Sequence, residues 1–141
     1  MTVQLEVRPY ELTDMAAVVR LWETCFPDDP PWNEPNDVLR RKLTVQPELL
    51  LVCLSDGRLV GTVLAGYDGF RGWVNKVATT PDFQRRGVAS RLMAVAEAEL
   101  TKLGCPKLNI QVRCGNDAAI EFYKSLGYTI EPRVSLGKRL G

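Results

Sequence analysis

Apolar and polar residues alternate at the start of the chain, where Val3, Leu5 and Val7 predict a first strand. Over residues 14–25 the apolar positions recur instead at the spacing of a helix with one buried face. Thr13 precedes that segment and is the expected N-cap, because its hydroxyl can accept a hydrogen bond from the first turn. The chain is therefore expected to begin with a strand followed by a helix.

The next part of the chain changes from irregular to strongly strand-forming. Residues 26–35 contain four prolines and are expected to form a loop, followed by a short helix over residues 36–43. Turn-forming Asp-Gly pairs then separate compact apolar segments, which is typical of consecutive antiparallel strands. These strands are expected over residues 49–54, 58–67 and 72–79.

The remaining segments alternate between helix and strand. A long helix is expected over residues 87–103, a strand over 108–112, a helix up to residue 126, and a closing pair of strands over 128–130 and 134–136. The order predicts a mixed α/β (α+β) fold with a mostly antiparallel central sheet of six to seven strands flanked by about four helices. A chain of 141 residues is expected to form one domain, residues 1–141.

Composition excludes several classes of protein. Lys plus Arg total 18 and Asp plus Glu total 17, so the net charge is +1 and favours neither nucleic acid nor a membrane surface as partner. No apolar run reaches the length of about 18–20 residues that a membrane helix needs. The first residues lack the layout of a secretion signal, so a cytoplasmic location is expected.

Histidine is absent, which excludes every mechanism that relies on a Ser-His or Cys-His pair. A zinc site would have to gather all four cysteines from scattered positions, and no metal is expected. Reduced thiols in a cytosolic protein are the better interpretation of these residues, which are Cys25, Cys53, Cys105 and Cys114. A covalent route through a cysteine is disfavoured because none lies beside an evident base in the sequence.

A basic turn before the long helix carries the clearest chemical signal. It contains Gln84, Arg85, Arg86 and Gly87, and it follows a predicted strand. The first N–H groups of a helix have no partner within the helix and, with the helix dipole, attract anions. Glycine lets the backbone approach phosphate oxygens closely, and arginine adds positive charge. The segment matches neither the dinucleotide-binding glycine pattern nor a Walker A loop, and a helix that merely begins with basic residues is the alternative.

This turn resembles the acetyl-CoA motif of the GNAT superfamily of N-acetyltransferases, Gln/Arg-x-x-Gly-x-Gly/Ala, at Gln84, Gly87 and Ala89. Residues 116–128 resemble a second pattern of that family, Asn-x-x-Ala-x-x-Phe-Tyr-x-x-x-Gly-Phe/Tyr, which includes Asn116 and Tyr123. Residues 31–33 and 135–139 are similar to a subgroup of small bacterial acetyltransferases. On structural grounds alone, Asn116 is a helix N-cap and Tyr123 a half-buried aromatic residue.

The resemblance implies an enzyme that transfers an acetyl group from acetyl-CoA directly to a primary amine of a small molecule or a protein, without a metal. It implies that Tyr123 is the general acid that protonates the leaving thiolate, and that backbone N–H groups of the fourth strand polarise the carbonyl. Dimers are common in the family, so a homodimer is an expected assembly. The implied cofactor-binding residues are Val77, Thr79, Gln84, Arg85, Arg86, Gly87, Val88, Ala89, Ser90, Asn116 and Tyr123.

The sequence departs from the family at the general base. Many members carry a glutamate on the fourth strand, whereas residues 73–76 here contain no carboxylate. Carboxylates of the proline-rich loop and the helix after it are the candidates, although a solvated surface is the simpler interpretation of Asp28, Asp29, Glu34 and Asp37. Trp32, Asn33 and Glu34 are candidates for lining the acceptor pocket, and packing of Trp32 on the core edge is an equal alternative.

Two other functions stay open at this point. The first is a non-catalytic acyl-CoA sensor or interaction domain on the same fold, because a fold does not fix a function. The second is an unrelated α/β domain that binds a different anion at the same turn.

Overall fold

The computed structural model describes residues 4–141, so Val3 of the predicted first strand lies outside the described residues. The chain divides into two units, one that ends at Gln111 and one that runs from Val112 to Gly141.

The first unit contains a five-stranded sheet in the simple order β1-β2-β3-β4-β5. Four strands pair antiparallel in sequence order, and the last pairs parallel to β4. The β2–β3 hairpin turns through Asp56 and Gly57, which both have positive φ, 50° and 79°, as the predicted Asp-Gly turn requires. The strands are β1 (Leu5–Pro9), β2 (Leu50–Ser55), β3 (Arg58–Tyr67), β4 (Gly72–Thr79) and β5 (Leu108–Ile110).

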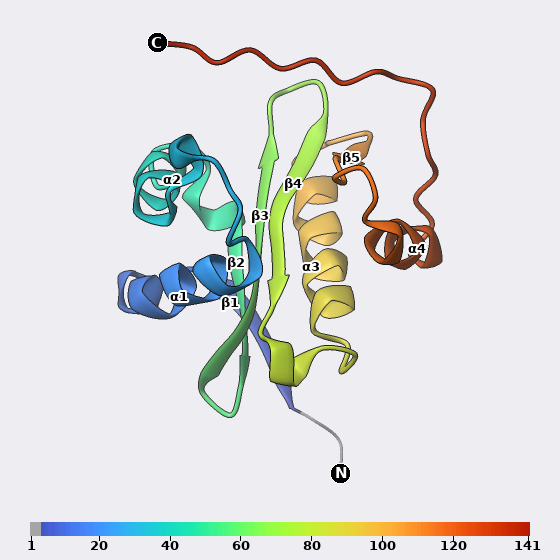
Figure 1. The fold of residues 1–141 in the computed structure, drawn as a ribbon. Helices are drawn as coiled ribbons and strands as arrows, with labels where there is room; N and C mark the ends of the chain where they lie inside the picture. Colours follow the sequence, from blue (N-terminus) through green and yellow to red (C-terminus); the bar gives the residue numbers. More distant parts are fainter. Residues whose placement is uncertain (1–3) are drawn as a thin grey trace. The chain divides into compact units, whose positions relative to one another are not determined.

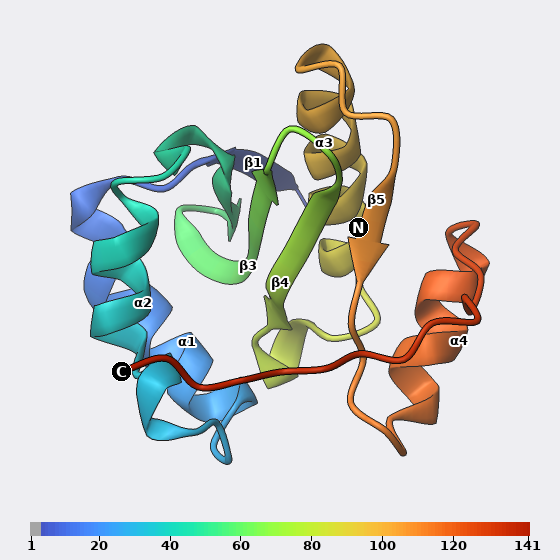
Figure 2. The ribbon, with the colours of Figure 1, turned by 90° about the horizontal axis from the view of Figure 1, so that it is seen from above.

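Helices cover both faces of this sheet. Successive strand residues point to opposite faces, and in β3 the Thr62 side chain bonds to Trp22 of α1 (Met15–Cys25), whereas a Cβ on Gly61 would meet α3 (Val88–Lys102). α1 and α2 (Pro35–Lys42) therefore lie on one face and α3 on the other, as Figures 1 and 2 show. The helix boundaries agree with the predicted segments to within one or two residues.

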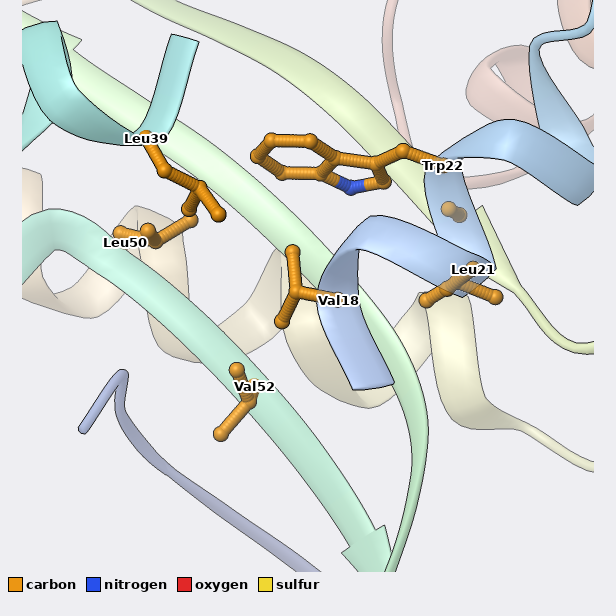
Figure 3. Packing of buried hydrophobic residues seen from close by; sticks show 7 residues of the cluster. Val18, Leu21, Trp22, Leu39, Leu50 and Val52 are labelled. Atoms are coloured by element: carbon orange, nitrogen blue, oxygen red, sulfur yellow. The ribbon is translucent and has the colours of Figure 1, made fainter. Parts of the chain in front are cut away.

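The core under α1 and α2 is continuous from helix to sheet. Figure 3 shows Trp22 lying between the helix layer and the strands, close to Val18 of the same helix and Leu39 of α2. Leu50 and Val52 of β2 alternate with residues that face α3, and both are completely buried. Burying a Leu or Val side chain stabilises a fold by about 1.5–3 kcal/mol, so this layer fixes how α1 lies on the sheet.

α3 approaches the other face unusually closely at Gly61. A Cβ on Gly61 would lie 2.5 Å from Cγ1 of Val88 and 2.9 Å from the carbonyl oxygen of Ala78. Both distances are shorter than ordinary van der Waals contact, so only glycine fits at this position. Val88 is the first residue of α3. Gly61 therefore determines where the N-terminus of that helix lies on the sheet.

Two expectations from the sequence are corrected. Thr13 does not cap α1, because residues Leu12–Asp14 already form a 3-10 turn; the Asp14 carboxylate instead accepts the Glu11 N–H at 2.8 Å and pairs with Arg8. The sheet of the described residues has five strands rather than six to seven. The expected strands at 128–130 and 134–136 are irregular, since Pro132 between them lacks an N–H and the Val134 and Leu136 side chains remain exposed.

Within residues 4–141, no helix is both long enough and apolar enough to cross a membrane. The four cysteines are free thiols, and Cys53 is the buried one among them.

We predict that Gly61→Ala lowers the free energy of unfolding by about 1–3 kcal/mol, because the added methyl group must displace Val88 or the Ala78 backbone. Gly66→Ala is the matched control in the same strand, since its Cβ would find its nearest atom at 3.5 Å. Urea denaturation of both variants measures the difference. Equal midpoints for the two variants would show that the close approach of α3 does not require glycine.

Candidate functional site

The outer edge of β4 is open over its second half. The parallel ladder to β5 consists of Gly72, Trp73 and Val74 and stops there, whereas the ladder to β3 continues to Thr79. Backbone N–H and C=O groups of residues 75–79 that point away from β3 therefore have no partner strand in the described part of the sheet. Such groups are the ones an extended ligand can pair with.

A β-bulge interrupts β4 at the start of this open edge. Thr62 pairs with Ala78 and Leu64 pairs with Asn75, so two steps along β3 correspond to three along β4. Lys76 adopts a left-handed conformation with φ 52°, which costs about 1–2 kcal/mol for a residue with a Cβ. The bulge reverses the inward and outward alternation of β4, so that Asn75 and Ala78 face the same side as α1.

The predicted anion turn follows β4 and has the backbone shape expected of such a site. Arg85 and Gly87 have positive φ, 64° and 84°, while Arg86 between them does not. Alternation of this kind turns successive N–H groups toward one side and forms an anion-binding concavity. Gly87 is the N-cap of α3, no side chain caps the helix, and a Cβ on Gly87 would have no atom within 4 Å. The first N–H groups of α3 therefore lack both a partner within the helix and a side-chain cap at Gly87.

Cation–π contacts and an ion pair connect the side chains beside this turn. The Arg86 and Arg58 guanidinium groups lie 5.2 Å and 5.4 Å from the centre of the Phe83 ring. Arg58 also forms two hydrogen bonds to Asp82, at 2.7 Å and 3.1 Å. Gln84, Arg85 and Arg86 are exposed. Asp82 is thus neutralised by Arg58, and the net local charge that remains for a ligand is positive.

The predicted acceptor residues lie together in the loop between α1 and α2, each with a different environment. Trp32 is 48% exposed and does not join the core, and its carbonyl accepts a hydrogen bond from Arg41. Asn33 ends the 3-10 turn Pro31–Asn33. The Glu34 carboxylate caps α2 by accepting the N–H groups of Asn36 and Asp37, both at 3.0 Å. These hydrogen bonds lower the pKa of Glu34, and the one from the Asn36 N–H has the largest effect.

Two of the three other candidates for the general base, Asp29 and Asp37, form ion pairs. Asp29 forms a half-buried ion pair with Lys76, the residue at the bulge. Asp37 pairs with Arg40 one turn further along α2. Asp28 is exposed to solvent. The ion pair of Asp29 was not anticipated from the sequence, because it connects residues 47 positions apart.

The second unit contains α4 (Asp117–Ser125), and its N-terminus agrees with the predicted cap. The Asn116 side chain accepts the Ala119 N–H at 3.2 Å. The Tyr123 ring makes edge contacts with Phe122 and Tyr128, at centroid distances of 5.1 Å and 6.0 Å. Burial raises the pKa of the Tyr123 phenol above its ordinary value of about 10. The phenol is therefore protonated throughout the physiological range.

Sequence reasoning missed the interactions that support the bulge. The Trp22 indole donates to Thr62, and Thr62 donates to the Lys76 carbonyl, each at 2.9 Å. No sequence pattern indicates these contacts, because they join three separate elements. Gly61 did carry a signal, since an isolated glycine within a strand is typical of a close backbone approach.

Comparisons with known proteins find relatives over most of the chain. The model of the Acetyltransferase (GNAT) family matches residues 15–128. Acetyltransferase YE1169 of Yersinia enterocolitica is 44% identical over 136 residues, which are 96% of each chain. Among solved structures, Ard1 from Thermoplasma volcanium is 27% identical with a TM-score of 0.79, and the match covers 92% of this chain and 85% of that one. An aminoglycoside N-acetyltransferase, AAC(6')-Iy in complex with CoA, has a TM-score of 0.80 at 19% identity, covering 99% and 97%.

The chain belongs to the acetyltransferase (GNAT) family, because the family model spans most of it and a curated relative matches it almost end to end. The protein is therefore an acetyltransferase. The fold class predicted from the sequence is confirmed by these comparisons, apart from the number of strands.

Proposed function

We propose that this protein transfers the acetyl group of acetyl-CoA directly to a primary amine. One observation carries the proposal: a strand with an open edge leads into an uncapped helix N-terminus through a left-handed glycine, Gly87. A ligand with an extended polar arm and a diphosphate is complementary to these two features. The solved aminoglycoside acetyltransferase of the same fold was crystallised with CoA, which supports the choice of this ligand.

The residues of the turn fit a diphosphate by position and charge. The N–H groups of residues 87–90 would donate hydrogen bonds to the phosphate oxygens, and the arginine side chains would compensate the negative charge. The backbone of β4 after Val74 would pair with the amide groups of the pantetheine arm. In this proposal the ligand-binding residues are those expected from the sequence: Val77, Thr79, Gln84, Arg85, Arg86, Gly87, Val88, Ala89, Ser90, Asn116 and Tyr123.

Thr79 is oriented suitably for such pairing. The next residue, Thr80, donates its N–H to Val60 of β3 at 2.9 Å, so in a regular strand the Thr79 N–H points away from β3. The Thr79 carbonyl accepts a weak hydrogen bond from the Cys25 thiol at 3.5 Å. Burial raises the pKa of this thiol, which keeps Cys25 protonated and makes it a poor nucleophile.

Tyr123 is our proposed general acid. Attack by the amine forms the C–N bond and breaks the C–S bond, and the leaving thiolate takes the phenol proton of Tyr123. The proton that the nitrogen loses passes through solvent to the phenolate and restores it. A phenol whose pKa is raised by burial holds its proton at neutral pH. Direct attack within a complex of both substrates gains its rate mainly from positioning. The amine acceptor would approach from the loop that carries Trp32, Asn33 and Glu34. We propose no base on β4, because residues 73–76 contain no carboxylate.

Gly87→Ala should weaken acetyl-CoA binding at least about tenfold, because alanine resists the left-handed conformation that shapes the turn. Gly57→Ala is the matched control: Gly57 also has positive φ, 79°, and open space around its Cβ, but it lies in the β2–β3 turn. Both variants should lose similar stability. Calorimetric titration with acetyl-CoA measures the affinities, and equal weakening in the two variants would contradict this placement of the diphosphate.

Tyr123→Phe should lower kcat by about 10²–10⁴-fold, the usual contribution of a general acid, with the Kd for CoA changed little. Tyr128→Phe removes a hydroxyl from the neighbouring ring and should leave kcat near the native value. Steady-state kinetics with calorimetric binding separates the two effects. A Tyr123→Phe enzyme with native kcat would remove this residue from the reaction.

A panel of acceptors tests the reaction itself through the release of free CoA, detected with a thiol reagent. The panel should include small primary amines, aminoglycosides and peptides with a free N-terminus or a lysine. We expect release to depend on at least one class of primary amine. Binding of acetyl-CoA without release for any acceptor would favour the non-catalytic sensor instead.

A further inference from the structure

The left-handed conformation of Lys76 is unusual for its location. Four residues other than glycine have positive φ among residues 4–141, and Lys76 is the one of them that lies within a strand. A side chain with a Cβ adopts this conformation at a cost, and it persists only where the surroundings enforce it. The groups that hold Lys76 in this conformation therefore indicate the role of the bulge.

Two hydrogen bonds in series hold the Lys76 backbone. The Trp22 Nε1–H donates to Thr62 Oγ1 at 2.9 Å, and Thr62 Oγ1 donates to the Lys76 carbonyl oxygen at 2.9 Å. An indole N–H can only donate, so the Thr62 hydroxyl must accept from it and direct its single proton to Lys76. Thr62 is 0% and Trp22 is 1% exposed, so water does not compete for these groups.

The Lys76 side chain is held at the same time. Its ammonium group pairs with Asp29 and lies 4.4 Å from the centre of the Phe26 ring and 5.7 Å from that of Trp22. The Lys76 and Asp29 side chains are only 11% and 14% exposed. Trp22 therefore restrains Lys76 in two ways. Its N–H restrains the Lys76 backbone through Thr62, and its ring face attracts the ammonium group.

The carbonyl of Lys76 and the N–H of Val77 belong to the same peptide group. This peptide is trans and planar, so its N–H points opposite to its C=O. Because Thr62 fixes the Lys76 carbonyl, it also fixes the Val77 N–H in the direction away from the Thr62 hydroxyl. Val77 lies on the part of β4 that β5 does not pair.

We propose that Thr62 and Trp22 are positioning residues for acetyl transfer. By holding the peptide between Lys76 and Val77, they aim the Val77 N–H at the carbonyl oxygen of the acetyl group, where negative charge develops during attack. A donor that is already oriented stabilises this charge without having to reorganise. This inference rests on the proposed acetyl-CoA site and adds to it the groups that orient its hydrogen-bond donor.

Thr62→Val and Thr62→Ser test the hydroxyl directly, because valine has the shape of threonine without the hydroxyl and serine keeps the hydroxyl. We expect Thr62→Val to lower kcat by about 10–100-fold, the effect of a misaligned catalytic group, while the Kd for CoA stays within about twofold. Thr62→Ser should recover most of the kcat. Trp22→Phe, which keeps a ring but loses the N–H, is the second variant if Thr62→Val does not fold.

A purely structural role would produce a different set of results. It would weaken CoA binding in step with kcat, and Thr62→Ser would not restore activity selectively. Native kcat in Thr62→Val, or equal damage in Thr62→Val and Thr62→Ser, would overturn the inference. An inactive native protein with every acceptor would instead contradict the proposed function.

The ratio of the acetyl-CoA and CoA affinities provides a readout that needs no turnover. If the Val77 N–H contacts the acetyl oxygen, the native protein should bind acetyl-CoA more tightly than CoA. Thr62→Val should bring this ratio toward one without changing the Kd for CoA. A native protein with no preference for acetyl-CoA, or an unchanged preference in Thr62→Val, would also overturn the inference.

Discussion

The arrangement of this acetyltransferase depends on the point where β4 stops pairing with β5. The parallel ladder ends at Val74, while the antiparallel ladder to β3 continues to Thr79. In the part of the sheet that residues 4–141 describe, the backbone groups of residues 75–79 that point away from β3 therefore face no strand, and a polar ligand can pair with them. The turn that follows β4 leads to the start of α3, whose N–H groups we propose as the binding site of the diphosphate. The proposed ligand would thus meet two kinds of unpaired backbone group along one continuous segment.

Two neighbouring residues of β3, one on each face of the sheet, fix the positions of the start of α3 and of the bulge in β4. Gly61 lets the first residue of α3 approach the sheet, and thereby positions the anion turn. The adjacent Thr62 faces the other way and connects the bulge of β4 to Trp22 in the core under α1. Two consecutive residues of one strand therefore serve the two parts of the site. A change in the register of β3 by one residue would exchange their faces and disrupt both.

Charge is distributed differently around the two predicted binding regions. The anion turn keeps exposed arginine side chains, because Asp82 nearby is already paired with Arg58. In the loop before α2 and in α2 itself, carboxylates are engaged in structural interactions: Glu34 caps the helix, Asp29 pairs with Lys76, and Asp37 pairs with Arg40. Groups that hold structure in this way have less freedom to act as a base. The proposed reaction accordingly relies on positioning and on the proposed general acid rather than on a strong base.

Features that depend on neighbouring residues could be predicted from the sequence. Local spacing predicted four helices and the first five strands, the Asp56-Gly57 turn, the cap at Asn116 and the glycine at the start of α3. Three other features became visible only in the folded chain: the end of the β4–β5 ladder at Val74, the left-handed conformation of Lys76, and the ion pair between Lys76 and Asp29. The two predicted closing strands are not part of the described sheet. Helix periods and turns are encoded by residues a few positions apart in the sequence. A strand partner, a bulge or a buried ion pair depends instead on which distant segment packs against the strand or side chain.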